Sequence, residues 1–324
     1  MLGDASLPAV SLPGAAVGSS GPGGLAPVVL VGPTGAGKSS LALRAAAKVA
    51  GTEIVVVDSM QVYRGMDIGT AKPTPAERGE VPHHCLDLVD PDVDFSVTMF
   101  QEAGDHALGD LAARDARPLL VAGTGLYLRV LIDGFDPPGQ WPDVRSELER
   151  ERDTVALHRR LAEADPLAAG RMEPSNRRRV VRALEVTIGS GRPFSSFGPG
   201  LTHYPDNGIV QIGLRWPRPV LARRIEDRFL AMLDAGLLDE VRALADGPEP
   251  LSRTAAQALG YKELLAHLAG ESSLDEATSL TITRTRQFAV RQLRWFQRDP
   301  RIRWVEMDHD GDDAGALLMD ALSR

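Results

Sequence analysis

The chain has 324 residues, 43% of them hydrophobic, and a formal net charge of −8 from 36 Lys and Arg against 44 Asp and Glu. This apolar content is enough for a packed core and argues against intrinsic disorder, while the length allows one large domain or two. The acidic balance argues against indiscriminate nucleic-acid binding but allows a local basic face. The single cysteine, Cys85, excludes an internal disulfide framework, which is typical of cytoplasmic proteins.

The sequence also argues against membrane insertion and export. No apolar run reaches the roughly 18 residues of a membrane-spanning helix. Residues 1–27 contain no Lys or Arg and are rich in Gly, Pro, Ala and Ser, so they lack the basic start and compact apolar centre of a secretory signal. We interpret this segment as a disordered tail and expect no association with membranes.

The first apolar run, Val28–Val31, leads into a glycine-rich turn of the form G-x-x-x-x-G-K-S. The turn is Gly32-Pro33-Thr34-Gly35-Ala36-Gly37-Lys38-Ser39, and a strong helix former follows at residues 41–47. A strand, this turn and a helix together predict a P-loop, in which backbone N–H groups and the helix N-terminus surround a phosphate. Lys38 adds a positive charge, and Ser39 can hold a Mg2+ ion. The motif predicts phosphate binding without identifying the molecule that carries the phosphates.

Four more short runs have the composition of buried strands of a parallel sheet. They are Ile54–Val57, Leu119–Ala122, Ile209–Leu214 and Arg303–Met307. Helical patterns lie between them, as βαβ units require, and Ser96–Arg114 is typical of one helix with Ser96 as its N-cap. We therefore predict an α/β fold with a P-loop NTPase-like parallel sheet and helices on both faces.

The third and fourth runs are too far apart for one crossover. Residues 134–200 fill this gap with two charged helical stretches, near 143–164 and 175–189, between Gly- and Pro-rich segments. We predict an inserted helical domain at 134–200, with a pair of ordinary peripheral helices as the alternative. The core would then comprise residues 28–133 and 201–308, the second part with helices at 218–245, 254–269 and 274–298, followed by a C-terminal tail at 309–324.

Arginine is concentrated in two stretches. Residues 171–192 hold six Arg against Glu173 and Glu185, and residues 284–303 hold seven Arg against Asp299 alone. Such blocks are usually solvated faces of helices. In an acidic protein they are also candidates for contacts with the phosphate backbone of a nucleic acid.

Asp58 ends the second run, so a parallel sheet would place its carboxylate at the C-terminal edge beside the P-loop. Three roles remain open: a Walker B ligand for Mg2+, a general base for a second substrate, and a helix cap. Thr124, which follows the third run, would offer a hydroxyl at the same edge. His83-His84-Cys85 suggests a metal site, but adjacent side chains diverge and no second ligand cluster is visible. We assign these three residues to a loop near the phosphate site.

Several separate stretches together resemble one family, the tRNA dimethylallyltransferases, also called tRNA isopentenyltransferases or IPP transferases. Besides the P-loop, the most specific is Asp58-Ser59-Met60-Gln61-Val62-Tyr63-Arg64-Gly65-Met66-Asp67-Ile68-Gly69-Thr70-Ala71-Lys72-Pro73. The others are Pro82-His83-His84, Gly123-Thr124-Gly125-Leu126-Tyr127, Arg182-Ala183-Leu184-Glu185 and Gly260-Tyr261-Lys262-Glu263. The resemblance runs from about Val28 to Trp304.

The resemblance implies transfer of a dimethylallyl group from dimethylallyl diphosphate to N6 of adenine 37 in tRNA, with Mg2+, by a cytoplasmic monomer. It implies that Asp58 is the general base, that Thr124 lies near the reacting centre, and that Gly32–Ser39 hold the diphosphate. It implies that the insertion clasps the anticodon stem-loop. The positions matching tRNA contacts are Asp58, Ser59, Met60, Gln61, Thr124, Arg145, Arg178, Arg179 and Arg182.

Two other classes of protein share such a sheet. A small-molecule kinase would use Asp58 for Mg2+ and ATP as its donor, but this leaves the arginine-rich insertion unexplained. A nucleotide-switch protein would bind a nucleotide without transferring any group, but no motif for guanine specificity is evident.

Overall fold

The structure is a computed structural model that describes residues 25–307 and 312–324, except residues 136, 199 and 202. The tail predicted at residues 1–27 lies outside the described residues apart from 25–27, which form no helix or strand.

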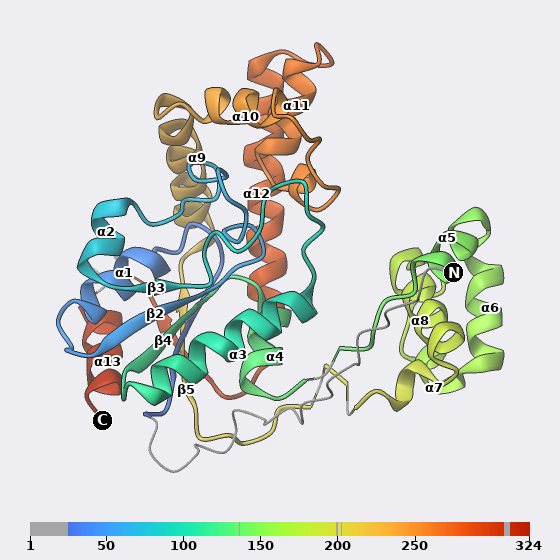
Figure 1. Ribbon diagram of the computed structural model, residues 1–324, viewed down its shortest axis with the longest axis horizontal. Helices are drawn as coiled ribbons and strands as arrows, with labels where there is room; N and C mark the ends of the chain where they lie inside the picture. Colours follow the sequence, from blue (N-terminus) through green and yellow to red (C-terminus); the bar gives the residue numbers. More distant parts are fainter. Residues whose placement is uncertain (1–24, 136, 199, 202, 308–311) are drawn as a thin grey trace, which may run out of the picture.

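Six strands form one parallel sheet in the order β3-β2-β4-β1-β5-β6 (Figure 1). They are β1 (Val28–Val31), β2 (Thr52–Val57), β3 (His83–His84), β4 (Arg117–Ala122), β5 (Val210–Arg215) and β6 (Ile302–Glu306). The pairs Val31↔Ala122 and Val57↔Ala122 align the carboxyl ends of β1, β2 and β4 at one edge of the sheet. The predicted α/β fold is confirmed. The sequence missed β3, because two residues show no periodicity.

Alternate residues along the strands face two separate apolar layers. Val28 and Leu30 pack in the layer under α1 (Lys38–Ala46). Val29 and Val31 pack in the layer on the opposite face, which holds buried residues of α3 (Val97–Ala113), α4 (Gly125–Ile132) and α12 (Leu274–Phe296). Because helices cover both faces, β1 is apolar along its whole length and β4 is apolar after Arg117, as is typical of parallel sheets.

The α12 side of the molecule extends beyond the sheet through three further helices. These are α9 (Arg218–Asp234), α10 (Leu237–Ala245) and α11 (Tyr261–Leu268). The single helical region predicted at 218–245 is two helices, because Gly236 adopts a left-handed φ of 98° between them. Similarly, Gly260 begins α11 with a φ of 90°, which separates it from the short turn of Ala255–Gln257. A capped helix, α2 (Pro75–Glu80), follows the loop after β2.

The segment between α4 and β5 forms a helical unit with its own core. It contains α5 (Pro142–Arg150), α6 (Thr154–Ala164), α7 (Pro166–Gly170) and α8 (Arg177–Ser190), and lies to one side of the sheet (Figure 1). Residues buried in this unit's core include Leu148, Leu157, Leu161, Val180 and Leu184. The stretch predicted at 143–164 is interrupted because the Asp153 side chain caps α6, accepting from two of its first N–H groups. This unit is the segment expected as an insertion.

Residues 312–323 of the segment predicted as a C-terminal tail, residues 309–324, are helical. Asp312–Ser323 form a helix, α13, whose Ala314, Leu318 and Leu322 are buried in the same apolar layer as α1. The spacing of these three apolar residues is helical. The pattern was not predicted as a helix because it is short and packs on a surface formed by residues distant in the chain. No helix in the described ranges has both the length and the apolarity needed to cross a bilayer.

Candidate active site

The P-loop joins the central strand β1 to α1 at the carboxyl edge of the sheet. Gly35 and Gly37 adopt left-handed φ values of 80° and 86°, which glycine tolerates without a steric cost. Gly37 is also the N-cap of α1, so the first N–H groups of this helix, next to the loop, have no acceptor within the helix. The predicted strand, turn and helix are therefore all present.

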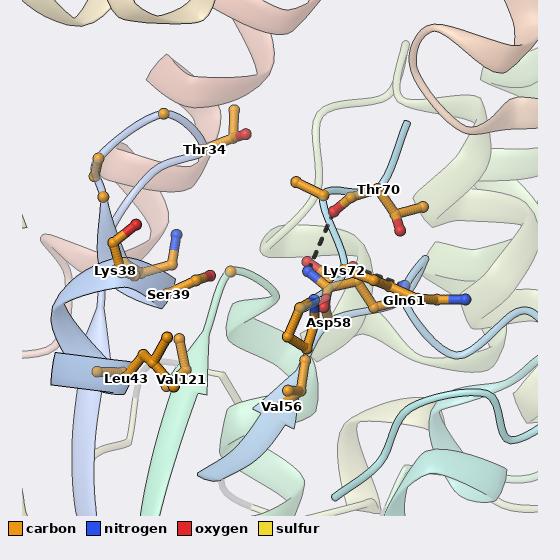
Figure 2. A pocket seen from close by; sticks show the side chains of 18 of the residues that line it. Thr34, Lys38, Ser39, Leu43, Val56, Asp58, Gln61, Thr70, Lys72 and Val121 are labelled. Atoms are coloured by element: carbon orange, nitrogen blue, oxygen red, sulfur yellow. Dashed lines mark hydrogen bonds between the residues drawn. The ribbon is translucent and has the colours of Figure 1, made fainter. Parts of the chain in front are cut away.

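A cavity of about 550 Å³ lies over this edge of the sheet. Figure 2 shows Lys38 and Ser39 on one side of it and Asp58, Gln61 and Thr70 on the other. Its wall also includes Gly123, at the end of β4, and side chains from α9 and α12. The structure thus brings the P-loop and Asp58 to one cavity from separate strands.

Lys38 lies inside the P-loop. Its Nζ donates to the carbonyl oxygens of Gly32, at 2.8 Å, and Pro33, at 3.0 Å. Burial lowers the pKa of Lys38 from 10.5 to about 8; nearby Asp58 opposes this change and Arg228 adds to it. The pKa of the ammonium thus lies close to the neutral range, and an anionic ligand would favour the charged form.

The two oxygens of Asp58 have different surroundings. Oδ1 accepts from the backbone N–H groups of Met60, at 2.8 Å, and Gln61, at 3.3 Å. Oδ2 is directed toward Gly123, where an added Cβ would lie 3.2 Å from this oxygen and 4.0 Å from Lys38 Nζ. One oxygen therefore fixes the loop after β2, and the other remains near the lysine, where it can accept a proton or hold a cation.

The remaining predicted residues near this edge fall into two groups. Gln61 lines the cavity, whereas Ser59, Met60 and Thr124 are not among its lining residues in the described part of the chain. Thr124 Oγ1 accepts from Ser59 N–H at 3.3 Å, so its hydroxyl joins the loop after β4 to the loop after β2.

Three functional candidates escaped the sequence analysis: Arg224 and Arg228 on α9, and Gln292 on α12, all of which line the cavity. Arg224 Nε donates to the Gly35 carbonyl at 2.9 Å, and Arg228 donates to Thr34 Oγ1 at 2.6 Å. Burial lowers the pKa of Arg228. Two guanidinium groups therefore border the phosphate loop, in addition to Lys38.

Gln292 connects two loops of the cavity. Its Oε1 accepts from Thr34 N–H and its Nε2 donates to the Gly123 carbonyl, both at 2.8 Å. The i, i+4 spacing of Arg224 and Arg228 was a usable signal, since it puts both on one helix face. No local pattern marks Gln292.

The arginines expected to contact RNA lie on α5 and α8 of the helical unit, which Figure 1 shows to one side of the sheet, and none of them lines the cavity. Arg178 and Arg179 are exposed on α8. Arg145 and Arg182 instead pair with Glu185, whose side chain is 2% exposed, at 3.4 Å and 2.9 Å. The structure therefore separates two exposed arginines from two that stabilise a buried carboxylate.

The residues after α2 are not simply the loop that the sequence predicted, because His83 and His84 form β3, which pairs in parallel with β2. His83 lines the cavity, and burial lowers its pKa. His84 pairs with Glu53, and burial raises the pKa of the Cys85 thiol to about 12. Among the described residues, no group of three or more His, Cys, Asp or Glu side chains could hold a metal ion.

The fold and this cavity define an α/β P-loop protein whose P-loop faces a carboxylate across one cavity, with an arginine-bearing helical unit beside the sheet. A model of the IPP transferase family matches residues 61–299, and one described as isopentenyl transferase matches residues 27–86. The chain belongs to the IPP transferase family.

Individual relatives agree with this assignment. The chain is 50% identical over 290 residues to a tRNA dimethylallyltransferase of Streptomyces coelicolor, covering 89% of this chain and 92% of the relative. It resembles the crystal structure of a tRNA isopentenylpyrophosphate transferase from Bacillus halodurans, with a TM-score of 0.65, 37% identity, and 91% and 96% of the two chains covered. It also resembles a eukaryotic dimethylallyltransferase acting on tRNA, with a TM-score of 0.71, 26% identity, and 90% and 76% covered.

Proposed function

We propose that this protein transfers a dimethylallyl group from dimethylallyl diphosphate to N6 of adenine 37 in tRNA, releasing diphosphate. The observation that supports this most directly is the cavity, in which Lys38 faces Asp58 across Gly123. One wall can stabilise a departing anion while the other accepts a proton. The relatives named for this activity, at high coverage, support the same proposal.

The donor would lie against the P-loop wall. An allylic diphosphate loses its leaving group readily because the allylic cation is delocalised, so the main barrier is negative charge building on the diphosphate. Backbone N–H groups of the loop, together with Lys38, Arg224 and Arg228, supply preorganised positive potential there. We propose all of them as the diphosphate site, with Gly32–Ser39 as its backbone.

Ser39 fits a role in holding Mg2+. Ser39 is exposed and lines the cavity, and its hydroxyl makes no hydrogen bond to any other described residue. Mg2+ prefers oxygen ligands and commonly binds through one or two protein groups together with substrate phosphates. The ion would neutralise charge on the leaving diphosphate.

The acceptor would lie against the Asp58 wall. As the C1–O bond of the donor breaks and the bond from N6 to C1 forms, N6 must lose a proton. Asp58 Oδ2 is the proposed acceptor of that proton. The adenine must leave its stack to enter the cavity, and an anticodon loop makes this less costly because its bases are not held in a duplex.

The helical unit would bind the anticodon stem-loop. Exposed arginines such as Arg178 and Arg179 can hold phosphates and set the register of the RNA. Ser59, Met60, Gln61 and Thr124 belong to the proposed acceptor side. We also propose that the protein is a cytoplasmic monomer. Light scattering during gel filtration tests the oligomeric state.

The function is tested by incubating the protein with unmodified tRNA, Mg2+ and either dimethylallyl diphosphate or ATP. We expect the tRNA to gain the mass of a dimethylallyl group with the first donor alone, and the gain to disappear when adenine 37 is replaced by guanine. Chelation of Mg2+ should slow the reaction. Phosphate transfer from ATP to a small molecule, with no change in tRNA, would instead support a kinase.

A further inference from the structure

The long loop after β2 closes into a tight turn over residues 67–72. Lys72 N–H donates to the Asp67 carbonyl and Ala71 N–H to the Ile68 carbonyl, each at 3.0 Å. Ala71 adopts a left-handed φ of 53°, which is unfavourable for a residue with a Cβ. Other contacts must therefore hold this turn in its conformation.

One such contact is an anion site filled by the protein itself. The N–H groups of Asp67, Ile68 and Gly69 all donate to the Glu240 carboxylate, at 2.9, 2.7 and 3.2 Å. Successive N–H groups that converge in a turn form a concave site for anions. Glu240 lies on α10, so a helix far along the chain binds the turn through charge-assisted hydrogen bonds.

Tyr261 supports this carboxylate from a second helix. Its hydroxyl donates to Glu240 Oε1 at 2.5 Å, and its side chain is fully buried. Burial, with help from Glu240, raises the pKa of Tyr261, so the hydroxyl keeps its proton for this bond. Its ring lies so close to Gly69 that an added Cβ would be 2.7 Å from the hydroxyl oxygen. Tyr261 thus faces the turn and not the solvent.

The turn forms part of the cavity wall on the proposed acceptor side. Thr70, Ala71 and Lys72 line the cavity, and the Thr70 carbonyl accepts from Gln61 Nε2 at 3.2 Å (Figure 2). Gln61 N–H in turn donates to Asp58 Oδ1. Hydrogen bonds at both ends of the turn, joined by its backbone and by Gln61, therefore connect Glu240 to Asp58.

We propose that Glu240 is a positioning residue for the transfer reaction: by binding the N–H groups of residues 67–69, it fixes Gln61 and the acceptor-side wall where the target nucleotide meets Asp58. This inference rests on the proposed function. Glu240 contacts neither the P-loop nor the cavity-lining arginines in the described hydrogen bonds, so its effect should be specific to the acceptor.

The test compares Glu240→Ala, Glu240→Gln and Tyr261→Phe with the wild-type enzyme. Asp239→Ala is the matched control, because Asp239 precedes Glu240 on α10, is 81% exposed and pairs with Arg242. Steady-state transfer measures kcat and KM for each substrate. Hydrogen–deuterium exchange measures protection of the amides of residues 67–69 and needs no activity.

For Glu240→Ala we expect kcat/KM for tRNA to fall about tenfold or more, equivalent to ~1.4 kcal/mol, while KM for dimethylallyl diphosphate changes less than about twofold. The amides of residues 67–69 should exchange faster. Glu240→Gln should recover part of the loss, since its amide oxygen still accepts, and Tyr261→Phe should cause a smaller loss. Asp239→Ala should match wild type.

Two results would overturn the proposal. One is faster exchange at residues 67–69 with unchanged kinetics for tRNA. The other is an equal loss for both substrates in Glu240→Gln and Tyr261→Phe, which would indicate a general structural role. If the wild-type enzyme transfers nothing, the proposed function itself fails, whereas the exchange result still tests the hydrogen bonds of Glu240.

Discussion

At the scale of single residues, Lys38 and Asp58 mark the proposed donor side and the proposed acceptor side of the cavity. Lys38 is bound to the P-loop carbonyls, and Asp58 uses one oxygen for the backbone after β2. Each side chain is therefore held in place by the loop that carries it. Substitution of Lys38 should therefore impair use of the donor more than binding of tRNA. Substitution of Asp58 should impair proton transfer more than binding of the donor.

Asp58→Asn separates the two roles of this carboxylate. Asn keeps an oxygen for the N–H groups of Met60 and Gln61, so the loop should be retained. It cannot take the N6 proton, and we expect the chemical step to slow by about 10²–10⁴-fold, the usual contribution of a general base. Single-turnover rates at saturating tRNA and donor, across a Mg2+ series, measure this. Recovery of the rate at high Mg2+ would reveal a metal ligand instead.

The lowered pKa of Lys38 predicts a pH dependence for donor use. With a pKa of about 8, the ammonium is charged below that pH and loses its proton above it. The anionic diphosphate favours the charged form, so kcat/KM for the donor should fall as pH rises through 8. Lys38→Arg keeps its charge throughout this range, so its profile should be flat. The same decline in Lys38→Arg would assign the titration to another group.

At the scale of elements, α12 connects the two sides of the cavity. Gln292 joins the P-loop to the end of β4. One turn later, the Trp295 ring packs where Gly125 has no Cβ. This helix therefore sets the spacing between the P-loop and the loop that carries Thr124.

Gln292→Ala should weaken this connection. It leaves Thr34 N–H and the buried Gly123 carbonyl without their partner, which should cost about 1–3 kcal/mol of the free energy of unfolding. We also expect KM for the donor to rise. Urea unfolding and steady-state kinetics measure the two effects. Gln287→Ala, at an exposed site on the same helix, is the control, and equal behaviour of the two variants would contradict the role of Gln292.

At the scale of the whole molecule, the P-loop core and the helical unit have separate apolar cores. The cavity proposed for the donor belongs to the first, and the exposed arginines of α8 belong to the second. RNA affinity and donor chemistry should therefore respond to different substitutions.

Arg178→Ala with Arg179→Ala should weaken tRNA binding and flatten its salt dependence. Each phosphate that the double variant no longer neutralises should reduce the slope of log affinity against log salt by roughly 0.7–0.9. Binding isotherms over a salt series measure the slope. Arg182→Ala should mainly destabilise the helical unit, because it leaves the buried Glu185 with fewer partners. An unchanged slope in the folded double variant would make Arg178 and Arg179 part of an ordinary solvated face.

The sequence alone determined the features that depend on neighbours in the chain. The P-loop, the apolar strands and the place of Asp58 at a strand end all follow from patterns of a few consecutive residues. The Ser96 cap was predicted in the same way, and its side chain accepts from Met99 N–H. The resemblance to a family also rests on such consecutive stretches.

Only the tertiary structure decided which distant side chains meet at the cavity. Gln292 binds a residue 258 positions away, Arg228 one 194 positions away, and Glu240 a turn at least 171 positions away. The packing of α9, α10 and α12 beside the sheet creates these contacts, and no local pattern encodes which side chains face each other. For the same reason the sequence did not predict α13. Its apolar face is short, and the surface on which it packs, the apolar layer that contains α1, is formed by residues distant in the chain.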